Sequence, residues 1–138
     1  MSRNNARPPT AISPTSPCPC GLDGSPFRDC CGSLHSGRTT ASTAERLMRS
    51  RFSAFAVRDA AYLLKTWHPT TRPSSLQLDP EQLWTRLDIL ATTEGSPFHT
   101  EGTVEFRAHF SVRGRADSQH EHSRFLRDNG QWVYLSPV

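Results

Sequence analysis

Lysine is nearly absent from this chain, because Lys65 is the only lysine among its 16 basic residues. The net charge is +3, and the arginines are spread along the sequence without forming a run of like charges. Nucleic-acid-binding surfaces usually gather Lys and Arg into a patch or stripe that follows the phosphates. The composition therefore argues against nucleic acid as a partner.

Long hydrophobic runs are also missing. No stretch approaches the roughly 20 apolar residues that a membrane-spanning helix needs, and the polar start of the chain, Met1 to Pro9, lacks the apolar segment of a secretory signal. We therefore expect a cytoplasmic protein with no membrane span. With 138 residues, the chain has room for one domain with a single core and a small appendage.

Cysteine is absent outside one short segment, which contains Cys18, Cys20, Cys30 and Cys31. Two cysteine pairs joined by a short loop can supply the four tetrahedral thiolate ligands that zinc accepts. Adjacent cysteines cannot easily bridge each other, and cytosolic thiols are normally reduced, which argues against two disulfides. The cluster therefore predicts one structural Zn²⁺, since four thiolates leave no open position for a catalytic water.

Two alternatives stay open at this metal site. Iron could take the place of zinc. His35 follows Cys31 closely enough to replace one cysteine as a ligand.

Polar segments surround the cysteines. Residues 1–16 contain one large aliphatic side chain, Ile12, and are predicted to be a disordered tail. Glycines and prolines among the cysteines are typical of tight turns. A second polar segment, residues 36–42, links the cysteine-rich segment to the rest of the chain.

Helix signals follow this link. Each predicted helix has a capping residue before it, and the first two have apolar residues at helical spacing. The predicted helices are residues 44–57 after Thr43, a second from Asp59 to His68 where Pro69 ends it, and a short third helix after Asp79 with Pro80 at its first position.

The C-terminal third changes to the period of two that is typical of strands with one buried face. The predicted strands are residues 104–112, 119–127 and 131–135, with a turn at Asp128-Asn129-Gly130 and a weaker strand at 86–93. Helices followed by antiparallel strands predict an α+β domain in which helices pack on one face of a sheet.

The cysteine pattern resembles the SEC-C motif, a zinc knob found at the C-terminus of the SecA translocation motor and in other bacterial proteins. That motif has Cys-x-Cys, a short loop, and then Cys-Cys or Cys-His. The loop here, residues 21–29, is one residue longer than in the motif. The resemblance implies a zinc knob over residues 17–35 (hereafter the knob), and a protein partner from the export or translation machinery.

The remainder of the chain is similar to the YchJ family of uncharacterised bacterial proteins. The segments that carry the likeness are Thr43–Phe55, Tyr62–Leu63, Thr66–Pro73, Val104–Phe106, His120–Phe125 and Gly130–Trp132. The resemblance covers about residues 16–136 and implies a nuclear transport factor 2-like (NTF2-like) cone over residues 43–138. In such a cone a curved antiparallel sheet wraps around helices and can enclose a pocket. The family implies an architecture and no established reaction.

Pocket candidates follow the second predicted helix. Trp67, His68 and Arg72 lie where a cone domain would place its pocket mouth, and His68 could act as an acid or base near neutral pH. The alternative is structural: His68 caps the helix, Trp67 belongs to the core, and Arg72 pairs with a carboxylate.

A second candidate set lies on the predicted strand 119–127. His120, His122 and Arg124 share one face, while Glu121 and Ser123 share the other. If the first set faces the cone, it forms a polar cavity for an anionic or carbonyl ligand; if it faces solvent, it is only a wet strand. Two further cavity candidates, Asp88 and His109, have no spacing signal of their own.

Two functions follow from these features. The first is a non-enzymatic interaction module, whose closed zinc site on a flexible tail offers a rigid surface to a protein partner. The second is a small-molecule binder or a lyase or isomerase, with His68 or His122 as acid or base and Arg72 or Arg124 holding an anion. An exposed sheet face would also suit a dimer.

Overall fold

The computed structural model describes residues 12–138. Most of the predicted tail, residues 1–11, lies outside the described residues. The tail's last residues, 12–16, are held against the knob, since Phe27 N donates to Ser16 O at 2.8 Å and Arg28 N to Pro14 O at 3.0 Å. Ordered structure therefore begins earlier than the sequence predicted.

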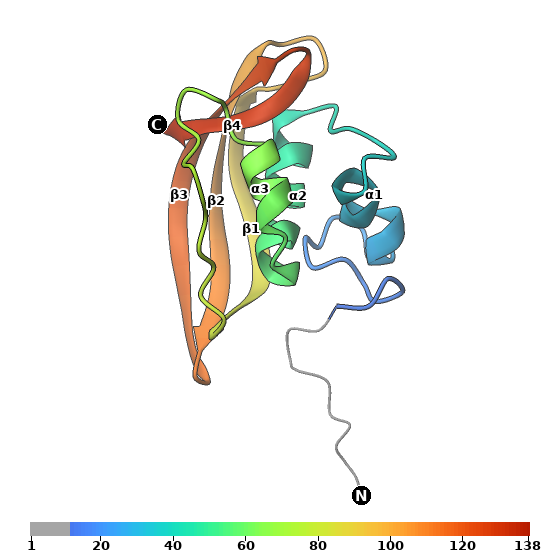
Figure 1. Cartoon of the computed structure of the whole chain (residues 1–138), viewed down its shortest axis with the longest axis vertical. Helices are drawn as coiled ribbons and strands as arrows, with labels where there is room; N and C mark the ends of the chain where they lie inside the picture. The colour runs from blue at the N-terminus through green and yellow to red at the C-terminus, as the bar shows by residue number, and fades with distance from the viewer. Residues whose placement is uncertain (1–11) are drawn as a thin grey trace, which may run out of the picture.

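A four-stranded antiparallel sheet in the order β1-β2-β3-β4 forms one layer of the molecule (Figure 1). Its strands are β1 (Gln82–Glu94), β2 (Glu101–Val112), β3 (Arg115–Asp128) and β4 (Gln131–Pro137). The register shifts between Trp84 and Arg86, between Ile89 and Ala91, and again in β3. Such bulges bend a strand and increase its twist. The expected α+β fold with helices on an antiparallel sheet is confirmed.

The helix α2 (Ala44–Val57) packs on this sheet and confirms the first predicted helix. Thr43 is its N-cap, because the Thr43 side-chain oxygen accepts from Arg46 N at 3.0 Å. Nine of the 14 residues of α2 are buried, more than the single stripe that contact with one sheet would bury. The helix is therefore covered on more than its sheet side.

The second helix, α3 (Ala60–Lys65), is shorter than predicted. Asp59 caps it as expected, accepting from Tyr62 N at 3.0 Å. The helix stops before His68 because the chain turns to join the sheet: Tyr134 N donates to Thr66 O, and His68 N donates to Tyr134 O. Backbone pairing with β4 thus ends α3 before Pro69 is reached.

The predicted third helix after Asp79 is wrong. Asp79 Oδ1 accepts from Glu81 N at 2.9 Å, so the aspartate closes a turn that leads directly into β1. Strand pairing begins at Gln82, opposite Val112. Trp84 then packs between Phe52 of α2 and Phe110 of β2, a tertiary contact that overrides the local helix signal.

The knob occupies a third layer. It contains the short helices η1 (Phe27–Asp29) and α1 (Cys31–His35). In Figure 1 the knob lies on the outer side of α2, while the sheet lies on the other side. The helix α2 is therefore a central element with a neighbour on each side, which explains its burial.

The main core lies between α2 and the sheet. Its buried members are Ala44, Leu47, Met48, Phe52, Leu87, Val104, Phe106, Ala108, Phe125 and Trp132. A second apolar cluster, Leu34, Ala54, Tyr62 and Leu63, joins α1, α2 and α3. The alternation predicted for residues 104–112 supplies this core, because every second residue of β2 from Gly102 to Ala108 is buried.

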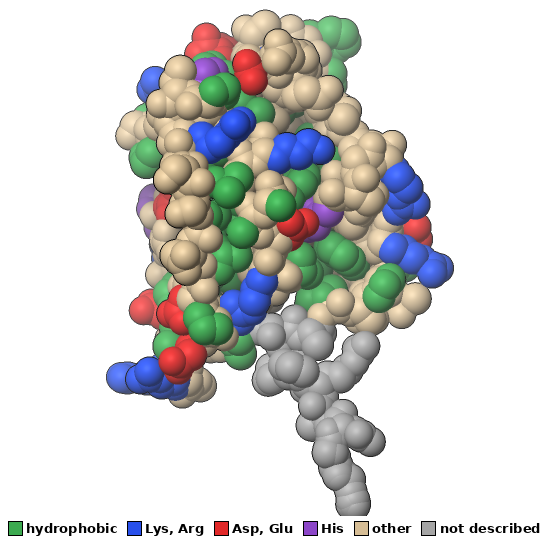
Figure 2. Space-filling view, viewed as in Figure 1, with side chains coloured by type: hydrophobic (Ala, Val, Ile, Leu, Met, Phe, Trp, Pro, Cys, Tyr) green, Lys and Arg blue, Asp and Glu red, His purple; other side chains and the backbone are tan. Residues whose placement is uncertain are grey.

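No helix within residues 12–138 is long and apolar enough to span a bilayer. On the face drawn in Figure 2, Lys and Arg side chains are scattered and do not merge into one patch. That nucleic acid is not a partner stays a prediction.

Candidate metal centre and the adjoining cavity

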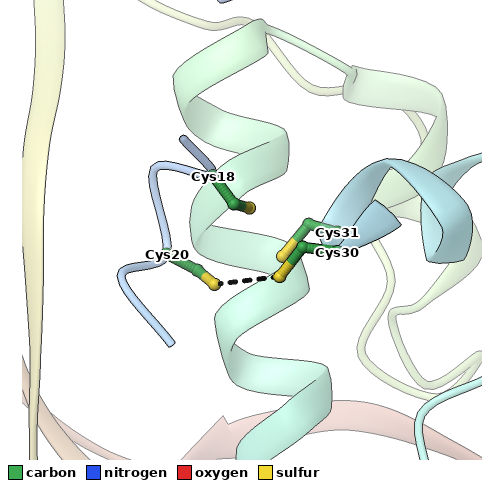
Figure 3. Close-up of side chains that lie close together, drawn as sticks. All are labelled: Cys18, Cys20, Cys30 and Cys31. Atoms are coloured by element: carbon green, nitrogen blue, oxygen red, sulfur yellow. Dashed lines mark hydrogen bonds between the residues drawn. The ribbon is translucent and has the colours of Figure 1, made fainter. Parts of the chain in front are cut away.

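Four cysteine side chains converge at one point in the knob. Cys18 and Cys20 come from the N-terminal loop, and Cys30 and Cys31 lie at the start of α1 (Figure 3). All four are buried, and their Sγ atoms all lie within 4.8 Å of one another. The structure thus brings together the four ligands that the sequence predicted.

The spacing of the sulfur atoms fits a tetrahedral metal ion. Zn–S bonds of about 2.3 Å in a regular tetrahedron place neighbouring sulfurs about 3.8 Å apart. Cys20 Sγ lies 3.7 Å from Cys30 Sγ, far beyond the roughly 2.05 Å of a disulfide bond. All four cysteines are free thiols. Four buried, clustered thiols are a donor set suited to one soft metal ion.

Tight turns hold the cysteines in place. Gly21 N donates to Cys18 O at 3.1 Å, and Gly21 has a φ of 69°, a conformation that favours glycine. The η1 turn takes up the rest of the loop, and Cys30 N donates to Phe27 O at 3.0 Å. The extra loop residue therefore does not prevent the two cysteine pairs from meeting.

Arg46 of α2 is the nearest positive charge to the sulfur atoms. Its Nη1 donates to Cys31 Sγ and its Nη2 to Cys30 Sγ, each at 3.3 Å. The neighbouring thiols Cys20 and Cys31 lower the pKa of Cys18, and Cys18 in turn raises the pKa of Cys31. Metal binding displaces these thiol protons, and Arg46 then offsets part of the thiolate charge.

The knob is fastened to α2 on its cysteine side. Arg49 Nη1 donates to Cys20 O at 2.7 Å, and Ser53 Oγ lies 3.5 Å from Cys18 Sγ. Glu45 Oε2 accepts from Arg49 Nε at 2.9 Å and holds that arginine in place. The expectation of a zinc site on a flexible tail is therefore corrected, because the cysteine side of the knob is covered by α2.

His35 is a structural neighbour of the cluster and lies outside the four-cysteine ligand group. Its Nε2 lies 2.8 Å from Ser50 O, and its ring packs on Tyr62 at 4.4 Å and on Phe27 at 5.5 Å between centroids. Burial lowers the pKa of His35, which favours the neutral ring. The histidine therefore joins the knob to α2.

A cavity of about 260 Å³ lies on the opposite side of α2, between the helix and the sheet. Its lining is mainly aromatic and apolar, with three polar residues from β3 and one arginine from α2. The lining residues are Met48, Arg51, Phe52, Phe55, Trp67, Trp84, Phe106, Ala108, Gln119, Glu121, Ser123 and Tyr134. Among the five predicted pocket residues, Trp67 is the one that lies in this lining.

His68 and Arg72 lie outside the cavity lining, and their side chains hydrogen-bond to nearby residues of their own loop. His68 Nδ1 accepts from Thr70 N at 3.2 Å and contacts Thr70 Oγ1 at 2.8 Å. Arg72 donates from Nε and Nη2 to Trp67 O, at 3.1 and 2.9 Å. Instead of a helix cap and a carboxylate partner, the two side chains stabilise the turn after Trp67.

The second candidate set faces solvent. His120, His122 and Arg124 are exposed, whereas Glu121 and Ser123 line the cavity. His120 Nε2 lies 2.6 Å from Glu105 Oε2 on the outer face of the sheet. Of the two alternatives for this strand, the solvent-exposed one therefore holds. His122 and Arg124 do not line the cavity.

Asp88 and His109 also lie outside the cavity lining. They contact each other across β1 and β2, with His109 Nε2 at 2.8 Å from Asp88 Oδ2. This contact and a hydrogen bond from Arg86 lower the pKa of Asp88. The two residues form a surface pair, and their prediction as cavity residues is wrong.

Arg51 is the cavity residue that sequence reasoning missed. It is only 4% exposed, although arginines are rarely buried without a partner. A signal was present, because Arg51 interrupts an apolar stripe that continues through Leu47, Met48, Phe52 and Phe55. A charge inside a helical apolar stripe indicates a side chain directed at the core.

The fold and site can now be compared with known proteins. The family model described as the middle NTF2-like domain of YchJ matches residues 43–137. The chain belongs to the YchJ-like family. A UPF0225 protein of Streptomyces coelicolor is 57% identical over 121 residues, covering 88% of this chain and 94% of the relative. A UPF0225 protein of Ralstonia nicotianae is 42% identical, in an alignment that covers 91% of this chain and 92% of the relative.

Two solved structures share both the fold and part of the sequence. The solution structure of a SEC-C motif containing protein from Rhodopseudomonas palustris is 32% identical, with a TM-score of 0.73 over 85% of this chain and 94% of that one. A SEC-C motif containing protein from Psychrobacter arcticus is 29% identical, with a TM-score of 0.71 over 90% of this chain and 81% of that one. Both cover the greater part of this YchJ-like chain.

Proposed function

We propose that this YchJ-like chain is a small-molecule-binding protein, in which a structural zinc ion holds the knob together and the cavity beside α2 is the binding site. The observation that carries the proposal is the cavity itself, about 260 Å³ in volume, with one buried arginine in an aromatic lining. Cavities of this kind, apolar with a few polar groups, are the usual form of small-molecule sites.

Four tetrahedral thiolates would accept zinc or iron. Zinc is proposed because the cysteine pattern resembles the SEC-C zinc knob, and two similar solved structures are SEC-C motif containing proteins. Elemental analysis with native mass spectrometry should find one zinc per chain, and Cys30→Ser should lose it. The matched control is Ser36→Ala at the exposed end of α1, which should keep the metal because the Ser36 hydroxyl donates to Ser33 O and to none of the cysteines. A chain without metal, or with iron, would contradict the assignment; so would a mass lowered by disulfide formation.

A reducing compartment fits this zinc site. Thiolates bind metal only while they are reduced, and all four cysteines are free. We therefore propose the cytoplasm as the location. Fractionation of cells that express the full-length protein should find it with cytoplasmic markers.

Binding, and not catalysis, is proposed for the cavity. Within residues 12–138 its lining contains one carboxylate, Glu121, and no histidine or cysteine. The sequence-derived acid and base candidates, His68 and His122, lie elsewhere. The lining therefore contains neither of the acid or base candidates on which a reaction was predicted, and a binding role requires none.

The binding role is tested by filling the cavity. Ala108 is buried in the lining, so Ala108→Leu should remove most fragment binding measured by ligand-observed NMR. Ala116→Leu is the control, because Ala116 is exposed at the start of β3. Equal binding by the two variants would show that fragments bind elsewhere.

A second candidate function is docking of a protein partner on the knob. It is supported by Leu22, which is 43% exposed on the loop between the two cysteine pairs. Cross-linking of the full chain to a partner should be lost in Leu22→Ser and kept in Ala108→Leu if the knob is the docking surface. The reverse pattern would favour the cavity.

A dimer through the outer face of the sheet is a further proposal. His120, His122 and Arg124 lie on that face, so a sedimentation experiment should find monomers when Arg124→Glu is introduced, if that face forms the contact. A wild-type monomer would exclude this dimer.

A further inference from the structure

The cavity contains a buried positive charge without a negative partner. Arg51 Nη1 donates to Leu63 O at 2.8 Å and to Thr66 Oγ1 at 2.7 Å, both neutral acceptors. Within the described part of the chain, no carboxylate lies within ion-pair distance of Arg51. Burial lowers the pKa of Arg51 to about 10, so the side chain remains charged at neutral pH. A buried cation normally has a paired anion.

Two aromatic rings hold the guanidinium in place. Arg51 Cζ lies 5.2 Å from the Trp67 ring centroid and 5.0 Å from that of Tyr134. These cation–π contacts stabilise the charge but use no hydrogen-bond donor. The other two guanidinium nitrogens, Nε and Nη2, make no hydrogen bond to any of residues 12–138. Their N–H groups remain available to an acceptor.

Trp67 adds another unused donor. Its Nε1 is buried and has no hydrogen-bond partner within residues 12–138. A buried N–H without a partner is rare and costs stability. The unused groups of Arg51 and Trp67 are donors only, so the complementary ligand group is one that only accepts hydrogen bonds and carries negative charge. A carboxylate has this chemistry.

The remaining walls set the shape and charge of the ligand. Phe52, Phe55, Trp84 and Phe106 offer apolar surface to a flat body. Glu121 lies on the β3 wall and is only half-buried, while Arg51 is deeply buried. The negative charge of Glu121 opposes a second anionic group on the ligand. The cavity therefore favours one negative charge over two.

We infer that the cavity binds a small organic monoanion with a flat apolar body, whose carboxylate meets Arg51 and Trp67. The inference rests on the proposed binding role of the cavity and adds the chemical class of the ligand.

The test compares three probes that share one ring system: 2-naphthoate, its neutral analogue 2-naphthamide, and the dianion 2,6-naphthalenedicarboxylate. Binding to the full-length, metal-loaded protein is measured by calorimetry and ligand-observed NMR. We expect 2-naphthoate to bind at least about tenfold more tightly than the amide, as expected for one charge-assisted hydrogen-bonded contact. The dianion should bind more weakly than the monoanion, and Glu121→Gln should reduce that difference.

Two variants assign the effect to named groups. Arg51→Gln should lower the affinity for 2-naphthoate to that for the amide, and Arg86→Gln on the exposed outer face should change neither. Because Arg51→Gln can also disturb folding, Trp67→Phe provides a second measurement that removes the N–H and keeps a smaller aromatic side chain. It should weaken 2-naphthoate about threefold to tenfold and weaken the amide less, because a hydrogen bond to a neutral carbonyl is weaker than one to a carboxylate.

The outcomes separate this inference from the proposal on which it rests. Equal affinity for the acid and the amide would overturn the monoanion class and leave a neutral-ligand site in place. Acid binding that survives both Arg51→Gln and Trp67→Phe would also overturn it. If none of the three probes binds, the cavity is no site for ligands of this size, and both proposals fail.

Discussion

In the knob, the largest fully buried side chains are those of Cys20 and Cys31, whereas in the domain they include Trp132, Phe52 and Phe125. The cysteine cluster has one partly buried hydrophobic neighbour, Phe27. The domain instead buries a continuous apolar core between α2 and the sheet. Small side chains contribute little apolar area against the entropy of ordering the loop. This difference predicts that the knob's order depends on a metal ion, while that of the domain does not.

Removal of the metal is expected to have the largest effect on this contrast. A strong chelator under reducing conditions should disorder residues 17–35, because structural zinc supplies most of the folding free energy of such sites. Hydrogen exchange should show lost protection in the knob and retained protection in β2 and β3. Equal loss in knob and sheet would mean that the two regions fold as one unit.

Truncation of a side chain in the apolar core should destabilise the domain and leave the metal in the knob. Phe125 is fully buried, so Phe125→Ala should lower the free energy of unfolding of the domain by about 3–5 kcal/mol. Metal content of the folded protein should stay the same. The control is Phe98→Ala, since Phe98 is 95% exposed and its loss should change stability by about 0.5 kcal/mol or less.

Arg46 tests the connection between the two regions. Removal of its guanidinium, which donates to two sulfur atoms, should weaken metal affinity by about tenfold to a hundredfold in a competition titration. Arg46→Lys should recover part of the loss, because it restores the charge without the two-pronged geometry. An Arg46→Ala protein with wild-type affinity would show that the sulfur cluster does not need this charge.

The smallest expected effect is a pH dependence at His35. Burial lowers its pKa in the folded protein below the ordinary 6.5, so the unfolded chain takes up a proton first as the pH falls. The contribution of His35 to stability is therefore present above pH 6.5 and is lost as the pH decreases toward the folded-state pKa. Unfolding of metal-loaded wild type and His35→Gln, compared at the same pH values, should show the steeper decline for the wild type. Parallel curves would assign the pH dependence to the thiolates instead.

Local signals predicted the metal centre and most of the fold. The four cysteines, the Thr43 and Asp59 caps and the alternation along β2 each act over a few residues, and their structural counterparts are as expected. Contacts distant in sequence decided the errors. Asp79 closes a turn because Trp84 packs on α2 and β2, and α3 stops early because Tyr134 pairs with the chain at Thr66.

The sequence could not predict which face of β3 lines the cavity or how the knob attaches to α2, because both depend on contacts distant in sequence. Alternation in β3 separated His122 and Arg124 from Glu121, but which set faced inward depended on the position of the helices. The buried role of Arg51 needed the ring positions of Trp67 and Tyr134. Likewise, the attachment of the knob to α2 follows from Arg46, Arg49 and Ser53, whose polar side chains read as an ordinary solvent face in the sequence.

That polar face is one of the two surfaces on which the knob packs against the domain. Arg46, Arg49, Ser50 and Ser53 follow the spacing i, i+3, i+4 and i+7, so they form one stripe of α2 separate from its apolar stripe. A domain without the knob would present these hydrophilic side chains to solvent, and beside them the apolar cluster of Ala54, Tyr62 and Leu63 that Leu34 covers. The knob therefore also shields apolar surface of the domain, so a graft onto another helix would need both the polar stripe and this apolar patch.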